Sequence, residues 1–178
     1  MKKEIFINME KEVFIGDVLD IGFENHGIVY NLYKKYNEVT AVEYINGKEE
    51  KFHLKEGGYD SCVMLFSFNN IWFNKDKRKL LKEIFTYLKR DGYIYIWDVD
   101  KGFKSTYIAN IKIFLPERKI REIKIRDINI LKDNSKENML KLMEENFDIV
   151  DFKVLNNIYY IKGKKKGCNI NEGCADSG

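Results

Sequence analysis

Short apolar runs alternate along this chain with segments in which apolar residues recur every three or four positions. Apolar runs of about four to eight residues are typical of buried strands, whereas the wider spacing is typical of amphipathic helices. Their alternation predicts βαβ units built on a mostly parallel sheet. Strands are expected at 18–22, 39–44, 59–66 and 93–98, and helices at 27–36, 75–89 and 135–145.

Three pairs of extended runs predict β-hairpins. The Asn46-Gly47 dipeptide favours a type I′ turn, so residues 39–54 are expected to fold back on themselves. Residues 106–131 contain two β-branched runs, which are expected to pair beside or over the carboxyl edge of the sheet. The isoleucine positions change parity there, which indicates a break near residues 126–127. Residues 147–163 are expected to form a closing hairpin.

Composition and charge restrict the class of protein. The chain has 178 residues, 44% hydrophobic and 14% aromatic, which is enough for one domain with a buried core. Its net charge of +3 is too small to imply a nucleic-acid partner. No apolar run approaches the roughly 20 residues of a membrane helix, and residues 1–16 lack the apolar segment of a signal peptide. We therefore expect a cytoplasmic protein without a membrane or nucleic-acid partner.

Cysteine and histidine give little support to a metal site. Cys62 lies in an apolar run and is expected to be a reduced core thiol. Cys168 and Cys174 lie in a polar tail, where a disulfide or a metal is the minor alternative because nothing frames the pair. The two histidines, His26 and His53, are too few for a histidine-rich site. No metal is expected.

The turn from Asp20 to Gly27, between a strand and a helix, is the most informative stretch. In open α/β sheets, ligands bind beyond the carboxyl ends of the strands. Glycines there let the backbone approach a ligand, and the start of a helix offers free N–H groups to an anion. Glu43 follows Gly22 by 21 positions, a spacing that places a carboxylate at the tip of the next strand for the hydroxyls of a ribose. Two interpretations stay open: a nucleoside site, or ordinary strand-end acids.

Taken in order, several short motifs resemble those of the class I S-adenosylmethionine-dependent methyltransferases. Val18-Leu19-Asp20-Ile21-Gly22 stands where that family has a strand running into a glycine-rich loop, and Glu43 stands where its second strand ends in an acid. Tyr59-Asp60-Ser61-Cys62-Val63 is similar to the opening of its fourth strand. Further similarities are the Phe68-Asn69-Asn70-Ile71 segment, the Leu88–Tyr93 turn into strand five, and residues 135–163 as the last helix and two antiparallel strands.

The resemblance implies one α/β domain over residues 1–166. Its Rossmann-like, seven-strand sheet would be mostly parallel and would end in an antiparallel C-terminal hairpin. Only fourteen residues, 45–58, separate the second strand from the next motif, so the sheet is expected to be shortened after strand two. Residues 106–131 would be a β-hairpin insertion, and residues 167–178 a disordered polar tail.

The resemblance also implies S-adenosylmethionine as the cofactor and methyl transfer as the reaction, with an undetermined small-molecule or protein acceptor. Such catalysis is mostly positioning, because the sulfonium already carries the reactivity. The positions that match the family's cofactor site are Asp20, Gly22, Phe23, Glu24, Glu43 and Asn69. The candidates for contact with the acceptor are Asn69, Asp98 and His26.

The loop after Asp20 departs from the family, in which it normally reads Gly-x-Gly-x-Gly. Glu24 replaces a glycine here, and its carboxylate would oppose that of the cofactor's methionine. A catalytically inactive interaction or nucleoside-binding module is therefore the alternative to an enzyme. His26 as a solvated loop residue, Asn69 as a turn residue and Asp98 as an ordinary strand-end acid also stay open. A nucleic-acid-modifying enzyme is disfavoured, because its proline-containing motifs are absent.

Overall fold

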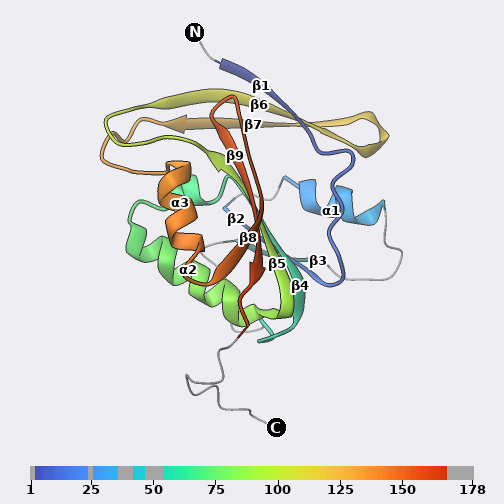
Figure 1. Ribbon diagram of the computed structural model, residues 1–178. Helices are drawn as coiled ribbons and strands as arrows, with labels where there is room; N and C mark the ends of the chain where they lie inside the picture. The colour runs from blue at the N-terminus through green and yellow to red at the C-terminus, as the bar shows by residue number, and fades with distance from the viewer. Residues whose placement is uncertain (1–2, 24–25, 36–41, 47–53, 168–178) are drawn as a thin grey trace.

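The computed structural model describes residues 3–23, 26–35, 42–46 and 54–167, which form two sheets and three helices (Figure 1). The strands are β1 (Lys3–Asn8), β2 (Val18–Gly22), β3 (Val42–Asn46), β4 (Tyr59–Leu65), β5 (Leu88–Val99), β6 (Tyr107–Leu115), β7 (Lys119–Asp127), β8 (Phe147–Leu155) and β9 (Ile158–Lys165). The helices are α1 (Ile28–Lys34), α2 (Asn74–Tyr87) and α3 (Lys136–Met143), and two short 3-10 turns are η1 (Phe68–Asn70) and η2 (Pro116–Arg118).

The main sheet has the strand order β3-β2-β4-β5-β9-β8. Its first four strands are parallel, whereas β9 runs antiparallel to both β5 and β8. The predicted fold class is thereby confirmed: an α/β fold with a mostly parallel sheet and an antiparallel C-terminal hairpin. The prediction of seven strands is wrong for the described part of the chain, in which this sheet has six.

The connection between β3 and β4 is short. Only residues 47–58 lie between these strands, too few for a helix, a strand and the turns that a further parallel crossover needs. In the described part of the chain β3 is the edge strand of the sheet, and the shortening after strand two stays a prediction. The returning strand of the hairpin predicted over residues 39–54 lies mostly outside the described residues.

A second sheet of three strands, in the order β1-β6-β7, lies across the end of the main sheet (Figure 1). We call it the cap sheet. The hairpin predicted over residues 106–131 is confirmed: β6 and β7 are antiparallel, and β7 ends at Asp127, at the predicted break. The sequence did not predict β1, which pairs parallel to β6 and contributes the buried Ile5. Six residues with one buried side chain give too weak an alternation to be recognised without their partner strand.

Two helix boundaries differ from the prediction. Helix α2 runs from Asn74 to Tyr87, so it ends two residues before the predicted limit of 89. Leu88 already pairs with the first residue of β4, so sheet pairing overrides the helical pattern there. Helix α3 begins as predicted, because the Ser135 side chain accepts a hydrogen bond from the Asn138 N–H at 3.3 Å.

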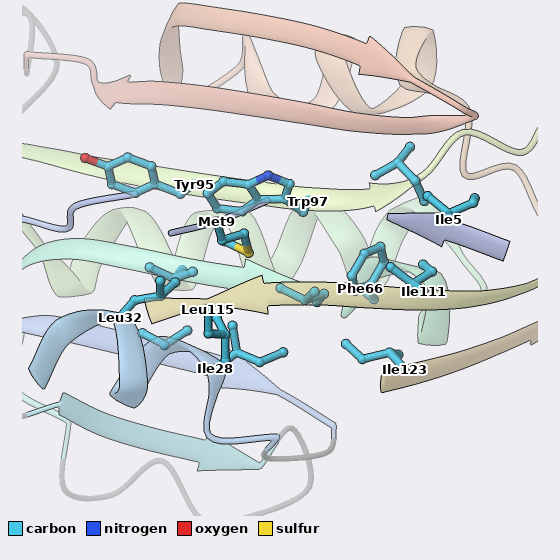
Figure 2. Packing of buried hydrophobic residues seen from close by; sticks show 14 of the residues in the cluster. Ile5, Met9, Ile28, Leu32, Phe66, Tyr95, Trp97, Ile111, Leu115 and Ile123 are labelled. Atoms are coloured by element: carbon cyan, nitrogen blue, oxygen red, sulfur yellow. The ribbon is translucent and has the colours of Figure 1, made fainter. Parts of the chain in front are cut away.

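Buried side chains form one cluster on each face of the main sheet. Helices α2 and α3 cover one face, and α1 with the cap sheet covers the other. Figure 2 shows the second cluster, in which Phe66 at the end of β4 lies beside Ile111 of the cap sheet, and Leu115 lies beside Ile28 of α1. Hydrophobic burial therefore attaches the cap sheet to the end of β4, where a parallel sheet binds its ligands.

Gly163 lets β9 pass close to its neighbours, which generates a stability prediction. A Cβ at this position would lie 3.0 Å from Phe147 Cβ and 3.2 Å from Ile94 Cγ2, both fully buried. Gly163→Ala should therefore lower the free energy of unfolding by about 1–3 kcal/mol in urea titrations. Gly102→Ala is the matched control, because its Cβ meets no atom within 4 Å. Equal effects of the two changes would contradict the packing at β9.

Candidate functional site

The cap sheet encloses a cavity at the carboxyl ends of β2 and β4. Its volume is about 490 Å³, and we call it the cap cavity. Three parts of the chain line it: the loop after β2, the end of β4 with turn η1, and β7. The lining residues are Phe23, His26, Leu65, Phe66, Asn69, Asn70, Ile123, Lys124, Ile125 and Arg126. Phe23, His26 and Asn69 were predicted as site residues, and the structure brings these three together.

A second cavity lies on the α2 side of the sheet and shares Phe23 with the cap cavity. We call it the apolar cavity, because side chains such as Ile21, Ile45 and Met64 dominate its wall. Its volume is about 220 Å³, and its charged residues, Asp76, Lys79 and Glu83 among them, belong to α2. The two cavities together follow the carboxyl edge of the sheet from β3 to the cap sheet.

Asp20 is a buried carboxylate without a partner in the described part of the chain. It is the third residue of β2, two positions before Gly22, and its side chain is 9% exposed. Burial alone raises the pKa of Asp20 to about 7. A buried acid that neither accepts a hydrogen bond nor faces a cation destabilises the fold, so such groups mark functional sites. Asp20 does not line either cavity; it lies directly behind the loop that does.

Asp98, near the end of β5, holds turn η1 by hydrogen bonds. The Asn69 N–H donates to Asp98 Oδ2 at 3.0 Å, and the Asn134 side-chain amide donates to Asp98 Oδ1, also at 3.0 Å. Asp98 is fully buried, and burial raises its pKa to about 6. The expected position near the strand end is correct. Both carboxylate oxygens of Asp98 accept hydrogen bonds, so Asp98 supports the turn. Asp98 does not line the cap cavity.

A buried ion pair at the end of β7 holds the same turn from the side of the cap sheet. Lys132 Nζ lies 2.6 Å from Asp127 Oδ2 at the end of β7, and it also donates to the backbone oxygen and to Oδ1 of Asn69. Lys101 Nζ lies 3.5 Å from the same Asp127 oxygen. The three charged residues are at most 4% exposed. One carboxylate and two ammonium groups thus join the cap sheet to the turn that lines the cavity.

Lys77 extends this network into α2. It is fully buried, and its Nζ donates to the Asp133 backbone oxygen at 2.7 Å and to Asn134 Oδ1 at 2.9 Å. Burial lowers the pKa of Lys77 to about 8. Because Asn134 also donates to Asp98, the segment after β7 is bonded at once to α2 and β5. These buried lysines could not be distinguished from the sequence, because lysine is common along the whole chain.

The remaining predicted residues have different placements. The His26 backbone oxygen accepts a hydrogen bond from Arg121 Nε at 3.2 Å, which ties the loop after β2 to β7. Gly22 ends β2 and is aligned with Asn46, the last residue of β3. Glu24 lies outside the described residues. The left-handed backbone of Gly27, with φ of 64°, ends the loop before α1.

Glu43 does not end its strand, so that prediction is wrong. It is the second residue of β3, aligned with Leu19, and the strand continues to Asn46. Its carboxylate accepts a hydrogen bond from the hydroxyl of Tyr59, the first residue of β4. The side chain is therefore directed toward the amino-terminal end of β4, beyond β2, and away from the edge where the cavities lie. Its role in binding a ribose stays a prediction.

Other chemistries find little support in the described residues. No group of three or more His, Cys, Asp or Glu side chains is placed there to hold a metal. Cys62 is a free, buried thiol, as expected, and Cys168 and Cys174 lie outside this part of the chain. None of the helices described is long and apolar enough to cross a membrane.

Residues 16–96 match the family model of the methyltransferase domain. This segment contains β2, α1, β4, η1 and α2, and therefore most of the lining of both cavities. The match covers a little under half of the chain, and the described fold is that of S-adenosylmethionine-dependent methyltransferases. No curated protein matches the chain.

Solved methyltransferases share the fold at low sequence identity. A methyltransferase from Aquifex aeolicus is 16% identical with a TM-score of 0.58, covering 84% of this chain and 82% of that one. One from Methanosarcina mazei is 15% identical with a TM-score of 0.56, covering 85% and 92%. The 1,6-didemethyltoxoflavin-N1-methyltransferase of Burkholderia thailandensis, solved with S-adenosylhomocysteine, is 13% identical with a TM-score of 0.54, covering 84% and 70%.

The ion network generates a prediction for Asp127. Asp127→Ala would leave the buried Lys101 and Lys132 without their carboxylate, and breaking a buried ion pair costs about 3–5 kcal/mol. We expect a loss of that order in the free energy of unfolding, measured in urea. Asp151→Ala removes a pair whose Lys153 is 69% exposed, so it should cost less than about 1 kcal/mol. Similar losses in the two variants would refute a special role for the buried network.

Asp20 generates a prediction about pH. The folded-state pKa of Asp20, about 7, lies above the ordinary aspartate value of 3.8, so protonation of the carboxylate favours the folded state. The penalty of the charged carboxylate is therefore absent below about pH 4 and fully present above about pH 7. Asp20→Asn should raise the free energy of unfolding by about 2–4 kcal/mol at pH 8, and the gain should shrink toward pH 4. A gain that is independent of pH would show that Asp20 is not the titrating group.

Proposed function

We propose that the protein transfers a methyl group from S-adenosylmethionine to an acceptor bound in the cap cavity. The observation that carries this proposal is Asp20, a buried carboxylate without a partner in the described chain, behind the Gly22 turn of the matched domain. A ligand with a positive charge would offset the cost of burying that carboxylate. The cofactor has such charges, an ammonium and a sulfonium.

The two cavities suit the two ends of the cofactor. The apolar cavity, with Ile21 and Ile45 in its wall, fits the flat adenine base. The more polar cap cavity fits the methionine end, and Phe23, which lines both, would lie beside the middle of the molecule. When bound, the sulfonium supplies an electrophilic methyl group. Gly22 and Asp20 would hold the cofactor, as the family resemblance implies for these positions.

The protein's own contribution is orientation. Lys132 binds the Asn69 side-chain oxygen, which leaves the amide N–H groups of Asn69 to donate to a bound molecule. Asp98 fixes the backbone of the same residue, so its position does not depend on the ligand. His26 lines the cavity and would accept a proton from an acceptor nucleophile. Ile123 and Ile125 exclude water from one side of the cavity.

An interaction module that has lost its cofactor is the second candidate. It is favoured by the short connection of residues 47–58, which leaves few residues for a further strand beside β3. Glu24, whose charge would oppose the cofactor's carboxylate, favours it as well. A module of this kind would keep the fold and bind no S-adenosylmethionine.

Calorimetric titration with S-adenosylmethionine and S-adenosylhomocysteine separates the two candidates. We expect saturable binding at about micromolar concentration, weakened roughly tenfold in Asp20→Asn, which loses the negative charge but keeps the shape. Asp151→Asn, an exposed change of the same kind, should bind like the wild type. Absence of heat and of any thermal shift with both compounds would reject the enzyme and leave the interaction module.

A further inference from the structure

Among the described residues that line the cap cavity, the charges are unbalanced. Lys124 and Arg126 are cationic, and none of these residues is an aspartate or a glutamate. The nearest acid along β7, Asp127, is buried against Lys101 and Lys132 and contributes no charge to the lining. The described wall of the cavity is therefore positive.

Neither Lys124 nor Arg126 has an ion-pair or hydrogen-bond partner for its side chain in the described part of the chain. Other cations of the cap sheet are paired: Lys112 Nζ, for example, lies 2.5 Å from Glu4 Oε1. Glu122, two residues from Lys124 on β7, instead accepts a hydrogen bond from Asn110. Two unpaired cations at one cavity are positioned for an anion from outside the chain.

The strand that carries the two cations also supplies an apolar wall. Lys124 and Arg126 lie two positions apart in β7, so their side chains leave the same face of the strand. Ile123 and Ile125 leave the other face and are buried. Because β7 is an edge strand, residues from both of its faces border the cavity. A molecule there would meet charge on one side and hydrocarbon on the other.

The dimensions favour a small molecule. A volume of about 490 Å³ lies within the range of roughly 300–1,000 Å³ that is typical of small-molecule sites. A nucleic-acid strand requires an extended basic groove with several stacking platforms, and the aromatic residues in this lining are Phe23 and Phe66 alone.

We propose that the methyl acceptor is a small molecule with a carboxylate or phosphate group, held by Lys124 and Arg126, and an apolar body that packs on Ile123 and Ile125. The role of this molecule as methyl acceptor rests on the proposed methyl transfer, whereas the anion site itself does not. The acidic group fixes one end of the molecule against β7. Its other end is thereby directed toward the loop after β2 and toward Asn69.

The same two cations could instead bind the carboxylate of the cofactor's methionine. The two sources of negative charge differ in a measurable way. A carboxylate of the cofactor would make the affinity for S-adenosylhomocysteine depend on Lys124 and Arg126. An anionic acceptor would leave that affinity unchanged and would bind in addition to S-adenosylhomocysteine.

The test is a calorimetric titration of the full chain with phenyl phosphate and benzoate, and with neutral benzyl alcohol, with and without S-adenosylhomocysteine. We expect the anions to bind at about millimolar concentration, more weakly as salt is added, and benzyl alcohol not to bind. Lys124→Gln/Arg126→Gln should weaken the anions roughly five- to tenfold and leave S-adenosylhomocysteine unchanged. Arg90→Gln/Lys141→Gln removes two exposed positive charges away from the cavity and should change neither affinity.

Each other outcome has a definite meaning. A weaker affinity of the double variant for S-adenosylhomocysteine, with the anions unaffected, would overturn the proposal in favour of the cofactor's carboxylate. Equal weakening in both double variants, or preferential binding of a single-stranded oligonucleotide, would overturn it in favour of a nonspecific basic surface. If S-adenosylhomocysteine fails to bind but the anions bind through Lys124 and Arg126, the anion site stands and the proposed methyl transfer falls.

Discussion

A buried ion pair, Lys132 with Asp127, fixes the end of β7 against turn η1, because its ammonium also donates to Asn69. Its two charges, 2.6 Å apart and almost inaccessible to water, are stable only while they stay together. The same ammonium binds Asn69, so the cap sheet and turn η1 have fixed positions relative to each other. The shape of the cap cavity follows from this contact, because β7 forms one wall of the cavity and turn η1 forms another.

The site is built from groups that weaken the fold. Burial raises the pKa of Asp20 to about 7 and that of Asp98 to about 6. The charged form of each carboxylate is therefore less stable in the folded protein than in water. Asp98 is compensated by hydrogen bonds from Asn69 and Asn134, and it serves the geometry of the turn. Asp20 has no such compensation in the described residues, and for that reason it is the stronger indication of a ligand.

The main sheet and the cap sheet differ in how the chain builds them. At the β3 edge, the chain uses only residues 47–58 to reach β4, and no described strand pairs beyond β3. At the other end of the parallel strands, β6, β7 and the early strand β1 add a cover of their own. The chain thus has few residues beside the place proposed for adenine and a whole sheet over the place proposed for the acceptor. Such a distribution is suited to a protein whose specificity lies in the cap.

The sequence by itself determined the order of strands and helices in the domain, because the periods of burial are local and survive without their partners. It also indicated the loop between Asp20 and Gly27 as a candidate site, and it predicted the hairpin formed by β6 and β7. It did not determine β1 or the end of α2, which depend on strands distant in sequence. Only the tertiary structure decided that Glu43 pairs with Tyr59 and that Lys124 and Arg126 border a cavity. The physical reason is that lysine, arginine and acidic residues are tolerated at almost any surface position. Three-dimensional packing alone decides which of these charges meet, which are buried and which are left for a ligand.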